Sequence, residues 1–215
     1  MPEWYRKAHR YIIDKNTDKP YITEDGHTMP NWKACPSMMD VFLSGYVLKT
    51  PCDIEFFINE EGTIDCKIED MKYRSFCMKR PPMSEFYHPF GYYKEHFAWL
   101  GDWGIESPPG YSILYTTPPN MFELPFTNTV GIIEGDAVSL AGSLPFFIIE
   151  GWTGTLPAGT PYLYVLPFKR DDWDSEFIFR DKKEIAASKK RNSQIFRDKP
   201  NGGVYKDKFW IKKEF

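Results

Sequence analysis

Two histidines and a glutamate between residues 85 and 100 form the only grouping of histidine with a carboxylate in the chain: His88, Glu95 and His96. Imidazole and carboxylate groups together bind iron and related metals, and such a site would need this set plus a further ligand on a later strand. No histidine follows His96, so Glu106 or Glu134 would have to complete the set. We therefore expect no metal site, with His88 and His96 as its only candidates.

The same segment is dense in aromatic residues, as is the whole chain, of which 17% is Phe, Trp or Tyr. Rings around one or two histidines suit a pocket that stacks a purine or pyrimidine base. Rings of this number also fill a core or a subunit interface, which is the simpler interpretation.

Four cysteines, Cys35, Cys52, Cys66 and Cys77, contain no Cys-x-x-Cys pair that would bind zinc or run redox chemistry. Reduced and mostly buried thiols in a cytoplasmic protein are therefore expected. No apolar run approaches the roughly 20 residues of a membrane span, which predicts a soluble, unexported protein with no membrane partner.

Charge is unevenly distributed along the chain, whose net charge is −3. Residues 180–215 carry 12 Lys or Arg against 5 Asp or Glu, so the first 179 residues have a net charge of −10. A basic tail on an acidic body can dock on a neighbouring subunit, meet an anionic ligand or simply be solvated. The acidic body would repel phosphates, so no nucleic-acid groove is expected.

Residues 106–170 contain runs of β-branched, aromatic and aliphatic residues separated by Pro and Gly turns, which are typical of strands. The expected strands are residues 111–116, 129–134, 145–150 and 162–168. No helical period lies between them, so the crossover helices of a parallel sheet are absent. The sequence predicts a mainly β fold, a roll or barrel of mostly antiparallel strands with its core at residues 106–170.

Flanking segments complete a single β-rich domain of residues 1–170. A β-rich extension comes first, and residues 35–45 form a short helix that begins near Pro36 and ends at Gly45. Strands follow at residues 46–50, 53–59, 63–69 and 73–78, the middle two as a hairpin around residues 60–62. Residues 171–215 are predicted as a helix over residues 174–197, capped by Asp174 or Ser175, and a basic aromatic arm.

Three motifs in the core resemble those of a known family. Residues 108–111 read Pro-Pro-Gly-Tyr before a strand, residues 130–136 read Val-Gly-Ile-Ile-Glu-Gly-Asp, and residues 155–161 read Thr-Leu-Pro-Ala-Gly-Thr-Pro before another strand. Their order and spacing are similar to those of the trimeric dUTPases and dCTP deaminases. The core also resembles an uncharacterised group of tailed-phage proteins. The resemblance implies the β-clip fold and a homo-oligomer, with a trimer favoured.

The chain departs from this family at positions that carry its chemistry. The Asp that orients the attacking water in the family is matched by Glu134, and the Tyr under the deoxyribose is matched by Ala137. Residues 117–120 (Thr-Pro-Pro-Asn) replace the phosphate-binding Arg-Ser-Gly and offer no guanidinium. A Gln of the late turn is matched by Tyr164. These changes favour a retained pocket with a new ligand over retained hydrolysis.

The resemblance therefore implies a non-enzymatic, phage-type binding protein that holds a small anionic, nucleotide-like ligand. It would act in the cytoplasm of an infected host cell by sequestering a defence signalling nucleotide. The implied contacts lie in the core and in the C-terminal arm, which could dock on its own or a neighbouring subunit: Tyr111, Asn120, Glu134, Asp136, Tyr164, Lys169, Arg170, Tyr205 and Trp210.

Two further functions stay open. A diverged nucleotide pyrophosphatase or deaminase would use Glu134 or Asp136 as general base, and a hydrolase would require Mg²⁺; otherwise no cofactor is expected. A virion or assembly component would instead carry an interaction surface and a pocket filled by rings. No Walker-type phosphate loop, Gly-x-Ser-x-Gly elbow or His-Glu-x-x-His motif is present.

Overall fold

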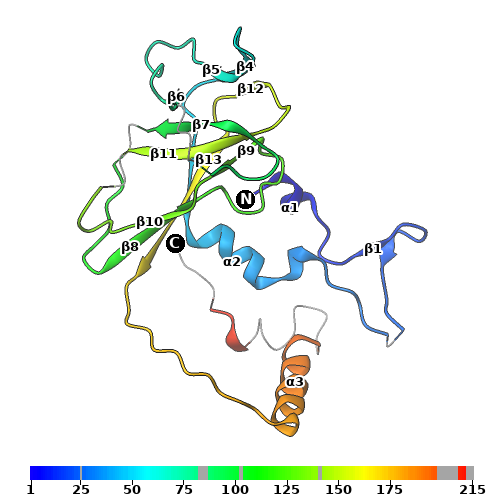
Figure 1. The fold of residues 1–215 in the computed structure, drawn as a ribbon. Helices are drawn as coiled ribbons and strands as arrows, with labels where there is room; N and C mark the ends of the chain where they lie inside the picture. The colour runs from blue at the N-terminus through cyan, green and yellow to red at the C-terminus, as the bar shows by residue number, and fades with distance from the viewer. Residues whose placement is uncertain (25, 82–86, 102–103, 140–141, 198–207, 212–215) are drawn as a thin grey trace. The chain divides into compact units, whose positions relative to one another are not determined.

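The computed structural model describes residues 1–24, 26–81, 87–101, 104–139, 142–197 and 208–211, with the backbone alone for residues 193–197. These residues form a mainly β structure (Figure 1). The helices are α1 (Glu3–Lys7), the 3-10 helix η1 (Trp32–Ala34), α2 (Pro36–Ser44) and α3 (Lys182–Arg197). The strands are β1 (Ile13–Asp14), β2 (Lys19–Pro20), β3 (Tyr46–Lys49), β4 (Ile54–Ile58), β5 (Ile64–Lys67), β6 (Cys77–Lys79), β7 (Tyr92–Leu100), β8 (Tyr111–Thr116), β9 (Phe126–Asn128), β10 (Gly131–Ile133), β11 (Ser143–Ile149), β12 (Gly154–Leu156) and β13 (Pro161–Lys169).

All pairs of neighbouring strands in these sheets run antiparallel. Two four-stranded sheets have the orders β10-β8-β13-β3 and β6-β7-β11-β9, a third sheet has the order β12-β4-β5, and β1 pairs with β2. The predicted mainly β fold with antiparallel strands is confirmed. The β-clip arrangement of these strands stays a prediction.

Aromatic rings fill the core between the sheets. Trp99 of β7 stacks on Phe146 of β11 with ring centroids 3.8 Å apart and an angle of 6° between the planes. The Nε1 of Trp99 donates to Asn128 Oδ1 at 2.8 Å, and Asn128 Nδ2 donates to the Tyr162 carbonyl at 2.7 Å. This buried amide links β7 and β9 of one sheet to β13 of another, and it satisfies the polar groups that the ring-filled core encloses.

The buried core extends well before residue 106. Phe56, Ile64 and Phe97 are almost completely buried and belong to one cluster with Phe146 and Val165. The prediction that residues 106–170 hold the core was therefore wrong in its extent. The reason lies in long-range pairing: β4 forms the predicted hairpin with β5 and also pairs with the distant β12, which draws residues near position 54 into the interior.

Contacts divide the chain into two compact units. The β-rich unit comprises Gly45–Asp171, and the terminal unit comprises Met1–Ser44 together with Asp172–Phe215. In the terminal unit Tyr5 of α1 is buried and packs edge-on against Phe42 of α2, with ring centroids 4.8 Å apart. The sequence carried no signal that would group the first 44 residues with the C-terminal segment, because no short-range pattern reports such a contact.

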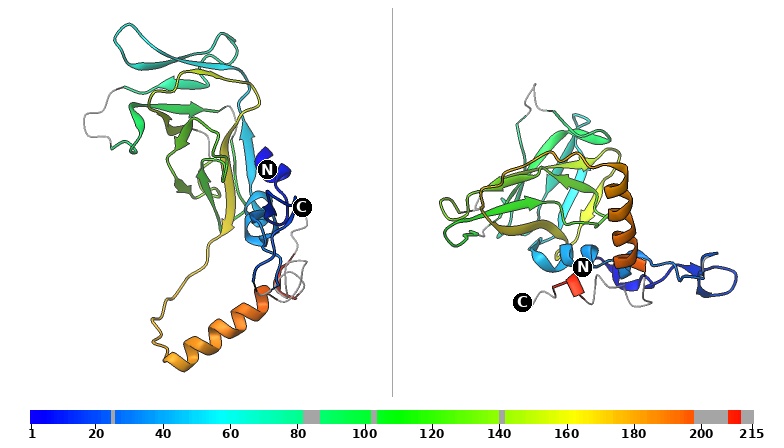
Figure 2. Two further views of the ribbon diagram at one scale, coloured as in Figure 1. Left: turned by 90° about the vertical axis from the view of Figure 1, so that its right-hand side faces the viewer. Right: turned by 90° about the horizontal axis from the view of Figure 1, so that it is seen from below.

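The two predicted longer helices have different outcomes. The helix expected at residues 35–45 is confirmed as α2. The helix expected from Asp174 begins only at Lys182, so its predicted start was wrong. Residues 172–181, which we name the aromatic linker, are extended and belong to neither a helix nor a strand (Figures 1 and 2).

Candidate functional site

Three neighbouring strands, β10, β8 and β13, bring charged residues to one end of their sheet. In the register between β13 and β8, Lys169 lies opposite Tyr111. Arg170 therefore follows β13 next to Gly110, which precedes β8. Glu134 directly follows β10, which pairs with the other side of β8. Antiparallel pairing is thus what gathers residues that are far apart in the sequence.

Arg170 binds both carboxylates that the sequence singled out, and we name Arg170, Glu134 and Asp136 the clasp. Its guanidinium pairs with Glu134 and with Asp136. Its Nη1 also donates to Asp136 Oδ1 at 2.9 Å and to the Tyr111 carbonyl at 3.0 Å. Asp136 Oδ2 accepts the N–H of Gly110 at 2.8 Å. The clasp therefore ties together the turn before β8, the turn after β10 and the end of β13.

The turn after β10 is held closely against β8. The hydroxyl of Ser112 donates to Glu134 Oε2 at 2.8 Å. A Cβ atom at Gly135 would lie 2.5 Å from Ile113 Cδ1 and from Ser107 Oγ, closer than side chains tolerate. A side chain at position 135, which lies between the two carboxylates that bind Arg170, would therefore require Ile113 and Ser107 to move.

The electrostatics of the clasp limit its chemistry. Hydrogen bonds from Arg170, and then from the Gly110 N–H, lower the pKa of Asp136 to about 2. The same pairing raises the pKa of Arg170 above its ordinary value. A general base works best when its pKa lies near the operating pH, so Asp136 is a poor base at neutral pH. An anionic ligand would have to displace Glu134 or Asp136 from Arg170.

Other predicted contacts lie elsewhere in the β-rich unit. The side chain of Lys169 is exposed and pairs with Asp171 at 3.4 Å, beside the clasp. Tyr164 lies opposite Thr116, five residues before Lys169 on β13 and hence roughly 17 Å away along the strand. Asn120 has a φ of 59° in the turn that follows the same distant end of β8. The sheet thus separates Tyr164 and Asn120 from Tyr111, Glu134, Asp136, Lys169 and Arg170.

The two C-terminal rings belong to the terminal unit. Trp210 Nε1 donates to Asp40 Oδ1 of α2 at 2.9 Å, so this indole has a partner within its own unit. Tyr205 lies outside the described residues. A ring from the arm that closes a ligand site in a neighbouring subunit stays a prediction.

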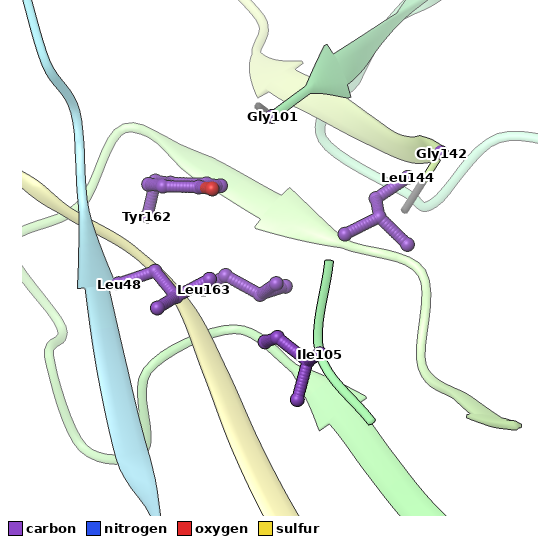
Figure 3. Close-up of a pocket in the computed structure, with 7 residues that line it drawn as sticks. All are labelled: Leu48, Gly101, Ile105, Gly142, Leu144, Tyr162 and Leu163. Carbon is purple, nitrogen blue, oxygen red and sulfur yellow. The ribbon is translucent and has the colours of Figure 1, made fainter. Parts of the chain in front are cut away.

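An apolar hollow lies in the β-rich unit, with about 260 Å³ of empty space that includes open solvent (Figure 3). The side chains of Leu144, Leu163 and Ile105 point into it, and the ring of Tyr162 borders it. None of the predicted contacts lines this hollow, whose full set of lining residues is Leu48, Gly101, Ile105, Gly142, Leu144, Tyr162 and Leu163. Its lining carries no charged side chain, and the space left in it for a water-sized molecule is only about 10 Å³, far below the roughly 300 Å³ of typical ligand pockets. No local sequence pattern indicates this hollow, because segments far apart in the chain form its walls.

The histidines with metal or base-stacking potential take different environments. His88 is exposed, whereas His96 is buried beside Phe147, with ring centroids 5.9 Å apart. Burial, and to a lesser degree Arg80, lowers the pKa of His96. Among the described residues no group of three or more His, Cys, Asp and Glu side chains is placed to bind a metal ion. The nearby Trp99 is fully buried in the core, so it is not available to stack on a base.

The aromatic linker carries a group of highly exposed, large apolar side chains. Trp173, Phe177 and Phe179 are 88%, 94% and 98% exposed, and Ile178 is also exposed. Phe177, Ile178 and Phe179 fall within the helix that was predicted over residues 174–197, whereas Trp173 directly precedes it. The signal that could have identified them is alternation, since acidic and aromatic residues follow one another with a period of two from residue 172 onwards.

The four thiols of the chain differ in their exposure. Cys52 and Cys77 are buried, Cys66 is partly buried, and Cys35 is exposed. Burial raises the pKa of the Cys77 thiol well above its ordinary value, with the neighbouring Cys66 adding to the shift. These environments suit packing in the core rather than nucleophilic chemistry at Cys77.

No helix in the described part of the chain is both long enough and apolar enough to cross a membrane. No family model, curated protein or solved structure matches this chain.

Proposed function

We propose that this chain is a non-catalytic assembly protein: the β-rich unit is a rigid scaffold, and the aromatic linker binds a second copy of the chain. The observation that carries the proposal is the exposure of Trp173, Phe177 and Phe179 on an extended backbone. Burial of a large apolar side chain is favourable by about 1.5–3 kcal/mol. Contiguous exposed apolar groups of this kind are typical of interaction sites.

The rest of the molecule supports a structural role over a catalytic one. In the clasp, one guanidinium already pairs with two carboxylates, and the low pKa of Asp136 makes that side chain a poor proton acceptor. The hollow beside Leu163 is small and carries no charged group. The core is filled by stacked rings. These features suit a stable scaffold, and none of the residues that line this hollow carries a charged side chain.

Native mass spectrometry of the full chain tests this function. The wild type should form an assembly of two or more chains. The triple variant Trp173→Ser, Phe177→Ser and Phe179→Ser should raise the apparent dissociation constant by about 100-fold or more, because interface aromatic residues often contribute over 1 kcal/mol each. The control Phe90→Ser removes an equally exposed ring outside the linker, and it should leave the assembly unchanged.

Circular dichroism should show the same secondary structure in all three proteins, so that a change in assembly reports the linker and not unfolding. A wild type that stays monomeric at high concentration would contradict the proposed function. So would a triple variant that assembles as tightly as the wild type.

A second candidate is the binding of a small anionic, nucleotide-like ligand in a cytoplasmic oligomer. The observation in its favour is that Tyr111, Lys169 and Arg170 meet at one end of the sheet. The ligand would take the place of Glu134 or Asp136 on Arg170. The same mass spectra test it: a nucleotide-sized added mass that disappears in Arg170→Gln would support it, and bare protein chains would contradict it.

A further inference from the structure

We propose that the aromatic linker of one copy adds as a strand to the exposed edge of β10 in a second copy. This inference rests on the proposed assembly function and assigns its acceptor surface. Strand addition supplies main-chain hydrogen bonds for affinity and side-chain contacts for specificity. Both partners of the contact, the linker and the edge, are present and exposed in the same chain.

The donor has the pattern of a strand. Residues 172, 174 and 176 are acidic, while residues 173, 177 and 179 are aromatic, with Ser175 between them on the same side. An alternation of this kind is typical of a strand with one apolar face and one solvated face. The linker is already extended. It therefore requires a sheet edge to pair with and a surface to cover its rings.

The acceptor is the outer edge of β10. Within the described strands β10 lies at the end of the order β10-β8-β13-β3 and pairs with β8 alone. An edge strand presents unpaired backbone groups to any other strand. Ile132 of β10 is 58% exposed, and Val130, which directly precedes the strand, is 65% exposed. This edge is both open and apolar.

Register across the sheet shows where the linker's rings would pack. Ile132 lies opposite Leu114 of β8, and Leu114 lies opposite Leu166 of β13. Residues that lie directly opposite one another share a face of the sheet, so these three form an apolar row that ends in the exposed Ile132. A strand paired with β10 would extend the row with one of its aromatic side chains.

Charge favours a second copy as the partner. The β-rich unit, Gly45–Asp171, has 9 Lys or Arg and 16 Asp or Glu, a net charge of −7. The helix α3, which directly follows the linker, has 6 Lys or Arg and 1 Glu, a net charge of +5. A linker docked on β10 of a second copy brings α3 to an acidic unit, and opposite potentials favour this encounter.

The linker is also long enough to reach a neighbour. Residues 171–181, fully extended, span about 36 Å. A unit the size of Gly45–Asp171 has a radius of gyration of about 14 Å. Because donor and acceptor are different surfaces, the contact is head-to-tail and closes into a ring when the rotation between copies allows it. A trimer is one such ring.

Cross-linking between two different variants tests the acceptor. Ser175→Cys in one protein and Ile132→Cys in the other are each made in a Cys35→Ser background, which removes the exposed native thiol. Mixing under mild oxidation should give a disulfide-linked dimer that joins position 175 to position 132. The matched control replaces Ile132→Cys by Phe90→Cys, an exposed site away from β10, and should give no such product.

A lysine placed on the edge strand β10 tests the acceptor independently, through its effect on assembly. Ile132→Lys should weaken assembly by about tenfold or more, since a lysine on an edge strand opposes pairing. Val138→Lys, at an equally exposed apolar position outside the strand, should leave assembly intact. If the protein assembles but gives no cross-link, and if Ile132→Lys does not weaken assembly, β10 is not the acceptor. The assembly function itself would then still stand.

Two other results would overturn the inference. A Ser175→Cys/Ile132→Cys double variant that forms only an internal disulfide would show that the linker docks on its own chain. A monomeric wild type would remove the assembly function itself, and the inference with it.

Discussion

Among single residues, Arg170 connects the most segments of the clasp, because its one side chain contacts the turn after β10 and the start of β8. It pairs with both Glu134 and Asp136 and donates to the Tyr111 carbonyl. Arginine suits this position because its planar guanidinium presents several donors in fixed directions. Asp136 in turn fixes the Gly110 N–H, in a turn where glycine has a φ of 83°. The clasp therefore stabilises the start of β8.

The clasp should give a defined pH dependence. The folded-state pKa of Asp136, about 2, lies below its ordinary value of 3.8. A lowered pKa of an acid means that its stabilisation is complete above pH about 4 and is lost as the pH falls from about 4 to about 2. The difference in Tm between the wild type and Asp136→Asn should be present at pH 7 and disappear across that window.

Thermal unfolding followed by circular dichroism measures this difference. Asp171→Asn is the matched control, because it removes the same charge from an exposed pair with Lys169 at the same end of the sheet. Exposed pairs contribute about 0–1 kcal/mol, so the control should change Tm little. A Tm difference for Asp136→Asn that persists unchanged at pH 2 would contradict the role assigned to the clasp.

The sequence could predict part of this site and not the rest. Tyr111, Glu134, Asp136 and Arg170 stand beside strand ends, and it was the family resemblance, not a local pattern, that grouped the four as one site. Asn120 and Tyr164 were predicted to lie with these four residues, but they lie at the opposite end of the sheet. The register of antiparallel strands decides which strand ends come together, and local sequence patterns do not report it. The hollow lined by residues of β3, β11 and β13 depends wholly on such register.

At the scale of elements, the start of α3 shows why a local pattern failed. The predicted helix began at residue 174 because its composition and its acidic cap residues are typical of helices. The true start is set by a capping box: the N–H of Glu184 donates to Asp181 Oδ1 at 2.8 Å, and the N–H of Asp181 donates to Glu184 Oε2 at 3.0 Å. Aromatic and β-branched residues before it favour an extended backbone.

Two variants distinguish these starts. Asp181→Ala should destabilise α3 by about 1 kcal/mol, the usual cost of losing an N-terminal cap, and should lower the helical signal in circular dichroism. Asp174→Ala removes the cap that the sequence suggested and should leave that signal unchanged, because residue 174 lies in the extended linker. An equal loss in both variants would show that the helix begins before residue 181.

Strand predictions succeeded where a run is long and bounded by turns. The strand expected at residues 111–116 is β8 residue for residue, and the hairpin of β4 with β5 formed as expected. The strands β9 and β12, of three residues each, were not anticipated. Strands so short are specified by the neighbours that pair with them, here β11 and β4, and not by their own sequence.

At the scale of the whole molecule, a well-packed β-rich unit is followed by a linker whose large apolar side chains are exposed. The β-rich unit buries its rings and pairs its clasp charges internally. The linker and α3 expose apolar and basic side chains, respectively. Helices in proteins gain most of their stability from the packing of one face against the rest of the structure. Assembly would therefore provide what both segments lack in a single chain.

Amide hydrogen–deuterium exchange of the wild type at low and high concentration tests this account most directly. Strand addition predicts that peptides covering residues 172–180 and residues 129–134 become protected together as the concentration rises, while peptides from the core β7 stay protected throughout. The coincidence of the two segments would identify the linker and β10 as partners. Linker amides that exchange at the rate of an unstructured chain at every concentration would contradict the claim that this segment binds a second copy.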